Sequence, residues 1–363
     1  MLHVELIDDV DVSQTDLFER YQYNIGELFA GAGGMALGAH KTKIDGHGFK
    51  HIWVNDFDKD ACLTFKHNFK ISDKNIHCCR VEKLNFNKLP RIDGLAFGFP
   101  CNDFSMVGDR NGIKGEFGGL YRWGVKALKT LKPSFFVAEN VSGLGSSGDN
   151  KDYKIILGEL EKSGYDVFPH KYHFEEFGVP QSRHRIIIVG FRKDLGIKDF
   201  THPSPTHQNN YIDCQTALSD IPEDAPNNER TKQSATVIER LKYIKPGQNA
   251  FTANLPEHLK LSMKSGATIS QIYKRLVPNK PSYTVTGSGG GGTHIYHWDE
   301  PRALTNRERA RLQSFPDDFL FVGGKESVRK QIGMAVPPKG AEVVFKAVLE
   351  TLLKYNVAKN AHR

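Results

Sequence analysis

The sequence predicts an α/β protein built on a mostly parallel sheet, with a second, smaller domain of irregular structure. Five short apolar runs have the length of strands, and helix-compatible stretches lie between them. Strands that alternate with helices are typical of parallel sheets, because parallel neighbours need a crossover connection. This alternation stops after about residue 195, which indicates the second domain.

The predicted strands lie, in order, at residues 24–29, 51–58, 94–99, 134–140 and 185–191. The first strand leads directly into AGAGGMALGAH, a glycine-rich turn that opens a helix. Helical spacing also follows the second strand and covers residues 120–131. Ligands of such sheets bind at the carboxyl ends of the strands, so the residues there are the candidates for a site.

The second domain is predicted from a change in composition. Residues 202–281 contain many Pro, Asn, Ser and Thr residues, and a glycine-rich loop follows at 287–292. Helical periodicity returns in RALTNRERARLQSFPDDF, and an amphipathic helix follows the double proline of the closing stretch.

Composition and charge narrow the class of protein. Hydrophobic residues make up 39% of the chain and charged residues 25%, as in folded water-soluble proteins. No apolar run reaches the roughly 18–20 residues that cross a bilayer, and the acidic start does not resemble a signal peptide, so we expect a cytoplasmic protein. Residues 1–23 carry a net charge of −5, which leaves +12 on the rest. That charge suits a nucleic acid partner, although an ordinary basic enzyme is an equal alternative.

Two features suggest a nucleotide-type cofactor. In FAGAGG the glycines allow close approach of the backbone, and the helix start offers free amide groups, although an ordinary tight turn is the alternative. Asp56 ends the second strand, where an acid can accept hydrogen bonds from ribose hydroxyls or cap the next helix. Phe57 is placed to cover an adenine face.

Reactive residue types follow the next strands. Cys101 lies on the loop GFPCNDFS, where a thiol beside helix amides or cations can act as a nucleophile, although cysteines of most proteins are buried and structural. Glu139 ends the fourth strand, where a carboxylate is costly unless exposed, paired or catalytic. Arg183 and Arg185 occupy alternate positions and so share a face, which suits a phosphate or a carboxylate; a solvated strand end is the alternative. Five cysteines without a CxxC pair predict reduced thiols and no metal site.

The ordered motifs together resemble those of the DNA (cytosine-5) methyltransferases of the bacterial restriction-modification type. They are FAGAGG, NDFD, GFPCNDFS, AENVSGL, GVPQSRHR, RALTNRERARLQSFPDDF and QIGMAVPP. The resemblance runs from about residue 24 to 350 and implies a Rossmann-like, S-adenosylmethionine-dependent methyltransferase fold. Its gap before TVTGSGGGG falls where this family keeps a variable target-recognition domain.

The resemblance implies a mechanism. Cys101 would attack carbon 6 of a cytosine flipped out of duplex DNA, and Glu139 would bind or protonate ring nitrogen 3. Arg185 would touch the carbonyl of the base or hold Glu139, and Arg183 would help to orient the adduct. S-adenosyl-L-methionine would supply the methyl group for carbon 5 and leave as S-adenosyl-L-homocysteine, with no metal.

Further residues match binding positions of the family. Those for the cofactor are Phe29, Gly31, Gly34, Asp56, Phe57, Pro100, Leu120 and Ala335. Ser105 and Thr284 match positions that hold DNA phosphate. Arg302 and Arg307 are expected to organise the recognition domain through internal pairing, with a surface salt bridge as the alternative.

Four positions depart from the family pattern. Arg80 stands where an acid meets the adenine amino group, a contact that is then lost or supplied by a residue such as Glu82. Asn102, Phe117 and Met334 replace a glutamine, an arginine and an asparagine that are common in the family. We expect these changes to alter affinity more than activity.

The resemblance divides the chain into five parts: an acidic extension 1–23, a large catalytic domain 24–199, a target-recognition domain 200–300, a hinge and support 301–324, and a C-terminal return to the large domain 325–363. It implies a monomer that binds double-stranded DNA, and it allows a cognate restriction endonuclease that acts on the same site without a stable complex. The alternatives are a related transfer RNA methyltransferase, an inactive DNA-binding relative and a nicotinamide oxidoreductase.

Overall fold

The computed structural model describes residues 22–99, 119–141, 151–261, 270–287 and 291–355. Within them the central sheet has eight strands in the order β2-β3-β1-β5-β6-β9-β7, and β4 also pairs with β3. The strands are β1 (Gln22–Leu28), β2 (Lys43–Ile44), β3 (His47–Asp56), β4 (Ile76–Cys78), β5 (Gly94–Gly98), β6 (Phe135–Val141), β7 (Tyr165–His173) and β9 (His184–Arg192). A separate small pair joins β8 (Gln181–Ser182) to β10 (Ser282–Tyr283).

The α/β fold is confirmed, and the sheet is mixed. The pairs β1–β3, β1–β5, β3–β4 and β5–β6 are parallel, but β9 runs antiparallel to both β6 and β7. The prediction that β9 continues the parallel alternation is therefore wrong, and β7 was not predicted. The segment of β7, YDVFPHKYH, lacks a continuous apolar run, so its pattern did not reveal a strand.

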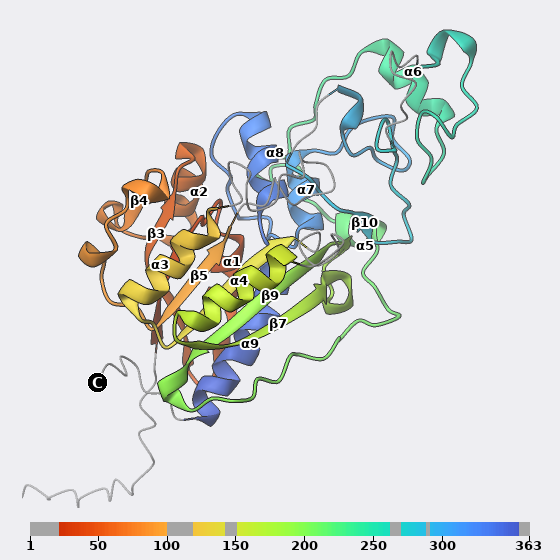
Figure 1. Cartoon of the computed structure of the whole chain (residues 1–363). Helices are drawn as coiled ribbons and strands as arrows, with labels where there is room; N and C mark the ends of the chain where they lie inside the picture. Colours follow the sequence, from red (N-terminus) through yellow and green to blue (C-terminus); the bar gives the residue numbers. More distant parts are fainter. Residues whose placement is uncertain (1–21, 100–118, 142–150, 262–269, 288–290, 356–363) are drawn as a thin grey trace, which may run out of the picture.

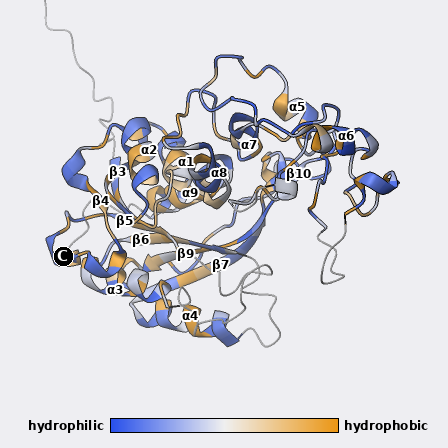
Figure 2. Cartoon of the chain, turned by 90° about the horizontal axis from the view of Figure 1, so that it is seen from above, coloured by the Kyte–Doolittle hydropathy of each residue, from blue (hydrophilic) through white to orange (hydrophobic). Residues whose placement is uncertain are grey.

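Helices cover both faces of the sheet, as Figure 2 shows from above. The helices are α1 (Gly34–Lys41), α2 (Lys59–Phe69), α3 (Tyr121–Leu131), α4 (Lys151–Lys162), α5 (Cys214–Leu218), α6 (Ala235–Tyr243), α7 (Asn306–Leu312), α8 (Lys325–Met334) and α9 (Pro338–Lys354). α1 and α9 share a buried apolar cluster with one face of the sheet, and α3 and α4 share another cluster with the opposite face. No described helix has the length and apolar character that a membrane span requires.

The chain returns to the sheet at its C-terminal end. α9 lies against α1 so closely that a side chain at Gly38 would approach the backbone oxygen of Pro338 to 2.5 Å. Phe345 of α9 packs edge-on against Phe49 of β3. The last helix therefore completes the core on which the first strands pack.

We call residues 200–324 the irregular region, because its described residues (200–261, 270–287 and 291–324) contain little regular structure. In Figure 1 most of this region extends away from the sheet, with α6 farthest from it and α7 close to α8. It has a small core of its own around Leu241, Leu259, Tyr273 and Tyr296, all buried. Few strands or helices are available here, so other groups must satisfy the buried backbone.

Candidate active site

Four parallel strands and one antiparallel strand bring the predicted residues to one edge of the sheet. The carboxyl ends of β1, β3, β5 and β6 meet there with the amino end of β9, because β9 runs in the opposite direction. We call this the sheet edge. Five of the residues singled out in the sequence lie outside the described residues: Pro100, Cys101, Asn102, Ser105 and Phe117. The described segment that contains β5 ends at Phe99, directly before Pro100 and Cys101.

The glycine-rich turn after β1 has the backbone conformation that its sequence predicts. Phe29, Gly31 and Gly33 all have positive φ angles, of 56°, 54° and 91°, a region in which only glycine is unstrained. A side chain at Gly34 would come within 2.2 Å of the carbonyl oxygen of Val336, whereas one at Gly31 would meet open space. Gly34 therefore allows the C-terminal segment at Val336 to approach this turn closely, and Gly31 leaves free space at the sheet edge.

Asp56 links the end of β3 to this turn. Its Oδ2 accepts a hydrogen bond from the Gly31 amide at 2.8 Å, and its Oδ1 accepts one from the Asp58 amide at 2.9 Å. Burial raises the pKa of Asp56, while these backbone amides act against the shift. The helix cap of α2 is Asp58, whose side chain accepts from two amides of the first turn. The alternative role of Asp56 as that cap is therefore wrong.

Phe57 lies beside a polar contact between α8 and the N-cap of α2, and Ala335 ends α8. The Phe57 ring is 61% exposed, and the Lys330 ammonium lies 5.7 Å from its centroid. Lys330 also pairs with Asp58 at 3.1 Å. Ala335 is buried at the end of α8, whereas the neighbouring Met334 is 57% exposed. The exposed ring leaves an aromatic face open to a ligand at this edge.

Leu120 and Glu82 line one cavity. This cavity, of about 410 Å³, is bounded by Glu82, Gly119, Leu120, Arg122, Trp123 and Lys126. Arg80, which departs from the family pattern, is exposed, and its Nε lies 3.6 Å from a Glu82 oxygen. Glu82 thus places an acid beside Leu120.

Glu139 and Arg185 form an ion pair at the sheet edge. The Nε of Arg185 lies 2.9 Å from Oε1 of Glu139, and each side chain is 12% exposed. Glu139 is in register with Ile187 in the antiparallel pair, so Arg185, two residues before Ile187, lies diagonally opposite on the same face. Strand register alone therefore brings the guanidinium to the carboxylate.

Glu139 also lies beside the end of β5. Gly98 is in register with Glu139, and a side chain at Gly98 would lie 3.4 Å from its Oε2. The buried Asn140 donates a hydrogen bond to the carbonyl of Phe99 at 3.2 Å. The carboxylate is thus next to the strand that leads into Cys101. The sequence analysis gave Asn140 no role, because an amide that holds a neighbouring backbone has no local signal.

Arg183 is buried, with 2% of its surface exposed. Its guanidinium donates hydrogen bonds to the carbonyls of Val285, Gly333 and Ala335 at 3.0–3.1 Å. Arg183 therefore holds the segment that follows β10 and the end of α8 together. The hydroxyl of Thr284, a predicted phosphate contact, is exposed and donates to the carbonyl of Ser182 at 2.8 Å.

Gln181 is a residue of the GVPQSRHR motif that the sequence analysis left without a role. Its buried amide donates to the Leu312 carbonyl and to Gln313, and its oxygen accepts from the Val285 amide at 2.7 Å. It thus joins α7 and the segment that follows β10 to β8. Its place in the motif signalled that Gln181 has a function, but its partners could not be predicted because they lie more than 100 residues away in the sequence.

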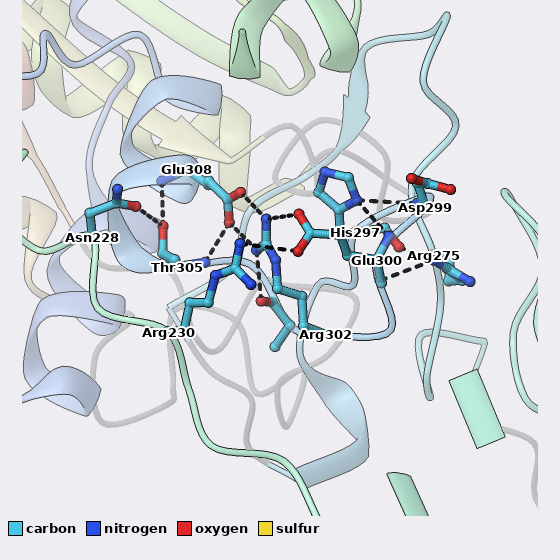
Figure 3. A network of polar contacts seen from close by, with 10 residues as sticks. Asn228, Arg230, Arg275, His297, Asp299, Glu300, Arg302, Thr305 and Glu308 are labelled. Atoms are coloured by element: carbon cyan, nitrogen blue, oxygen red, sulfur yellow. Dashed lines mark hydrogen bonds and ion pairs between the residues drawn. The ribbon is translucent and has the colours of Figure 1, made fainter. Parts of the chain in front are cut away.

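Arg302 lies at the centre of a polar network (Figure 3). Its guanidinium donates to both carboxylate oxygens of Glu308 at 2.7 Å and to Glu300 at 2.9 Å. Glu308 in turn completes the capping box of α7 with Thr305. The predicted internal pairing is thus confirmed for Arg302.

Arg307 is fully buried. It donates to the carbonyls of Pro226, Pro316 and Phe319 at 2.5–2.9 Å. It organises the irregular region, as expected, but through backbone carbonyls. The alternative of a surface salt bridge is wrong for Arg307, because no part of it is exposed.

Comparison with known proteins shows the family of this chain. A family model described as C-5 cytosine-specific DNA methylase matches residues 23–350. Type II methyltransferase M.BbvI of Brevibacillus brevis is 51% identical over 348 residues, which cover 92% of each chain. Type II methyltransferase M.NgoFVII of Neisseria gonorrhoeae is 44% identical over 331 residues, 89% of this chain and 85% of that protein.

A solved structure has the same fold. A crystal structure of a putative DNA modification methyltransferase from an E. coli prophage superposes with a TM-score of 0.71, at 24% identity, over 92% of this chain and all of the other. The match of the family model and the identity to M.BbvI both extend over almost the whole chain. The chain therefore belongs to the family of C-5 cytosine-specific DNA methylases.

Proposed function

We propose that this protein methylates carbon 5 of cytosine within a specific sequence of double-stranded DNA. The observation that carries the proposal is the Glu139–Arg185 pair, which lies at the sheet edge beside the strand that leads into Cys101. The names of the relatives, both type II methyltransferases, support a place in a type II restriction-modification system. The chain would act there as a monomer, with any endonuclease acting separately on the same DNA word.

The residues of the sheet edge fit S-adenosylmethionine, which supplies an electrophilic methyl group when bound. The turn that contains Phe29, Gly31 and Gly34 leaves its backbone accessible to a ligand, with free space beside the end of β1. Asp56 retains carboxylate lone pairs for ribose hydroxyls beyond the two amides that it accepts. Phe57 presents an aromatic face, and Leu120, Ala335 and Pro100 would complete the surface.

Cys101 would act as the nucleophile toward the base. Its thiolate forms a bond to carbon 6 of cytosine, which makes carbon 5 electron-rich enough to accept a methyl group. Loss of the carbon 5 proton then expels the thiolate and restores the aromatic ring. A base stacked in a duplex cannot reach this loop, so the cytosine must be flipped out.

Glu139 would bind ring nitrogen 3 and stabilise the charge that develops during the attack. Of the two roles considered for Arg185, its 2.9 Å contact supports holding Glu139 in place. The carbonyl contacts of Arg183 support a positioning role. Ser105 and Thr284 would contact phosphates, and the irregular region would read the bases.

The proposal is tested by methyl transfer from tritiated S-adenosylmethionine to duplex DNA and to transfer RNA. We expect label in DNA, and bisulfite sequencing of DNA from expressing cells should locate 5-methylcytosine in one sequence context. Label confined to transfer RNA would contradict the proposal. S-adenosylhomocysteine, and not NAD, should bind in calorimetry. A covalent complex with 5-fluorocytosine DNA would separate an active enzyme from an inactive DNA-binding relative.

A further inference from the structure

Two histidines and a glutamate come together at the corner where β7 ends and β9 begins. His173 is the last residue of β7 and stands directly opposite His184, the first residue of β9. Their rings stack with centroids 4.0 Å apart and planes 16° apart. Glu175 follows β7 in a tight turn, and its Oε1 lies 2.7 Å from Nε2 of His184. One ligand-type atom from each of the three residues lies within 4.8 Å of the others.

The structure assigns this cluster a metal site, and we propose that His173, Glu175 and His184 bind one divalent transition-metal ion such as Zn²⁺. Two imidazole nitrogens and one carboxylate oxygen are a ligand set that Zn²⁺ and its neighbours prefer, and three protein ligands leave one position for water. The proposed ion has no part in methyl transfer.

The surroundings of the cluster favour an ion over a simple hydrogen bond. Glu175 is 8% exposed, so its negative charge is largely withdrawn from water, and its second oxygen is fixed by the amide of Arg183 at 3.2 Å. The guanidinium of Arg185, the nearest cation along the strand, is already paired with Glu139. His173 and His184 are only half-buried, so a hydrated ion has access.

Binding requires small rearrangements. The lone pair of an imidazole nitrogen lies in the plane of the ring, so the stacked rings must tilt toward the ion. If Nε2 of His184 carries the proton shared with Glu175, that proton must move to Nδ1 before Nε2 can bind metal. The ion then replaces the hydrogen bond between His184 and Glu175, and it ties the end of β7 to the segment from which Arg183 and Arg185 extend.

The test is a Zn²⁺ titration of the full, untagged chain in competition with a chromophoric chelator. We expect one ion per chain, with at least tenfold weaker binding in each of H173A, E175Q and H184A. His170 provides a matched control, because it also lies on β7 and stacks on a histidine, His202, at 4.5 Å, but without a carboxylate among the described residues close to the pair. H170A should bind Zn²⁺ as the parent does.

Two further measurements keep the proposal falsifiable. Thermal unfolding should shift upward with Zn²⁺ in the parent and in H170A but not in E175Q, which is close in size to the native side chain and guards against loss of folding in H184A. Co²⁺ should give the visible spectrum of nitrogen and oxygen ligands. A thiolate charge-transfer band would place the ion on cysteines such as the exposed Cys78 and would overturn the proposal. Equal Zn²⁺ affinity in the parent and all three variants would overturn it too.

Discussion

Side chains are held in place by different means at the sheet edge and in the irregular region. At the sheet edge the register of strands sets the positions: Glu139 and Arg185 meet because β6 and β9 pair with a fixed offset. Asn140 adds one hydrogen bond to the neighbouring strand. Strand pairing there satisfies the backbone N–H and C=O groups, so the charged side chains are not needed for that purpose and are available for catalysis.

In the irregular region buried arginines satisfy the backbone carbonyls that strand pairing satisfies elsewhere. Arg275 is 5% exposed and donates to the carbonyls of Leu241, Ile244, His297 and Glu300 at 2.7–3.0 Å. Arg307 satisfies three more carbonyls. A chain with few ladders leaves carbonyls unpaired, and a guanidinium with five donors can satisfy several at once. Substitutions at the sheet edge should therefore impair chemistry, whereas those of the arginines should impair folding and DNA binding.

The largest effect on chemistry is expected from Cys101→Ser. Loss of the nucleophile should lower kcat by more than about 10³-fold while DNA binding is retained. Tritiated methyl transfer and a gel-shift assay measure the two properties. Undiminished methylation would remove Cys101 from its proposed role.

Glu139→Gln should lower kcat by about 10²- to 10⁴-fold, because the amide cannot supply a proton to ring nitrogen 3. Thermal unfolding should change less than activity, since the glutamine keeps the size of the side chain and a hydrogen-bond acceptor for Arg185. A kcat near that of the parent would contradict the role assigned to the carboxyl group.

Arg275→Met tests the role of buried arginines in the irregular region. Each carbonyl left unpaired costs about 1–3 kcal/mol, so the irregular region should lose its structure locally. We expect at least tenfold weaker DNA binding, with the affinity for S-adenosylhomocysteine unchanged in calorimetry. Lys242→Met is the matched control, because it removes the same charge from an exposed position. Equal losses in both variants would mean that charge, and not folding, explains the effect.

Arg302→Lys should have a smaller effect. Lysine cannot bind both oxygens of Glu308 and also reach Glu300, so we expect a loss of about 1–2 kcal/mol and a raised KM for DNA with little change in kcat. Glu308→Gln and the double variant complete a cycle. Additive losses in that cycle would show that the two residues are not coupled.

Glu27→Gln should change only the pH dependence of the free energy of unfolding. Because Glu27 lies in β1, we expect this change in the large domain alone. Nε2 of His51 lies 2.8 Å from Glu27, and burial raises the pKa of Glu27 to about 8 and lowers the pKa of His51 to about 3. Between about pH 4.5 and 8 the native protein keeps the Glu27 proton that the unfolded chain has released, so this group's contribution to stability falls as pH rises.

The effect is at most about 1.4 kcal/mol per pH unit. Urea unfolding is measured between pH 7 and 8, above the pKa of about 6.5 that His51 has in the unfolded chain, so that His51 contributes little to the slope. Over that range the variant should be less dependent on pH than the parent. Parallel profiles for the two proteins would be evidence against a protonated Glu27.

Much of the sheet edge could be predicted from local sequence. Gly31 and Gly33 of FAGAGG follow from the positive φ angles of the turn after β1, and Asp56 follows from its place at the end of a strand. The amphipathic α9 was visible from its periodicity behind Pro337 and Pro338. These features depend on residues close in sequence, so their patterns survive without the fold.

The sequence by itself determined the α/β fold class, the order of the five strands β1, β3, β5, β6 and β9, the motifs and the types of residue available for chemistry, because each depends on local conformation and periodicity. Only the tertiary structure decided that β9 runs antiparallel, that Arg185 pairs with Glu139, and that Arg183 and Arg307 hold distant carbonyls. The physical reason is that strand direction and the partners of a buried guanidinium depend on packing between segments up to about 150 residues apart, which no local pattern encodes.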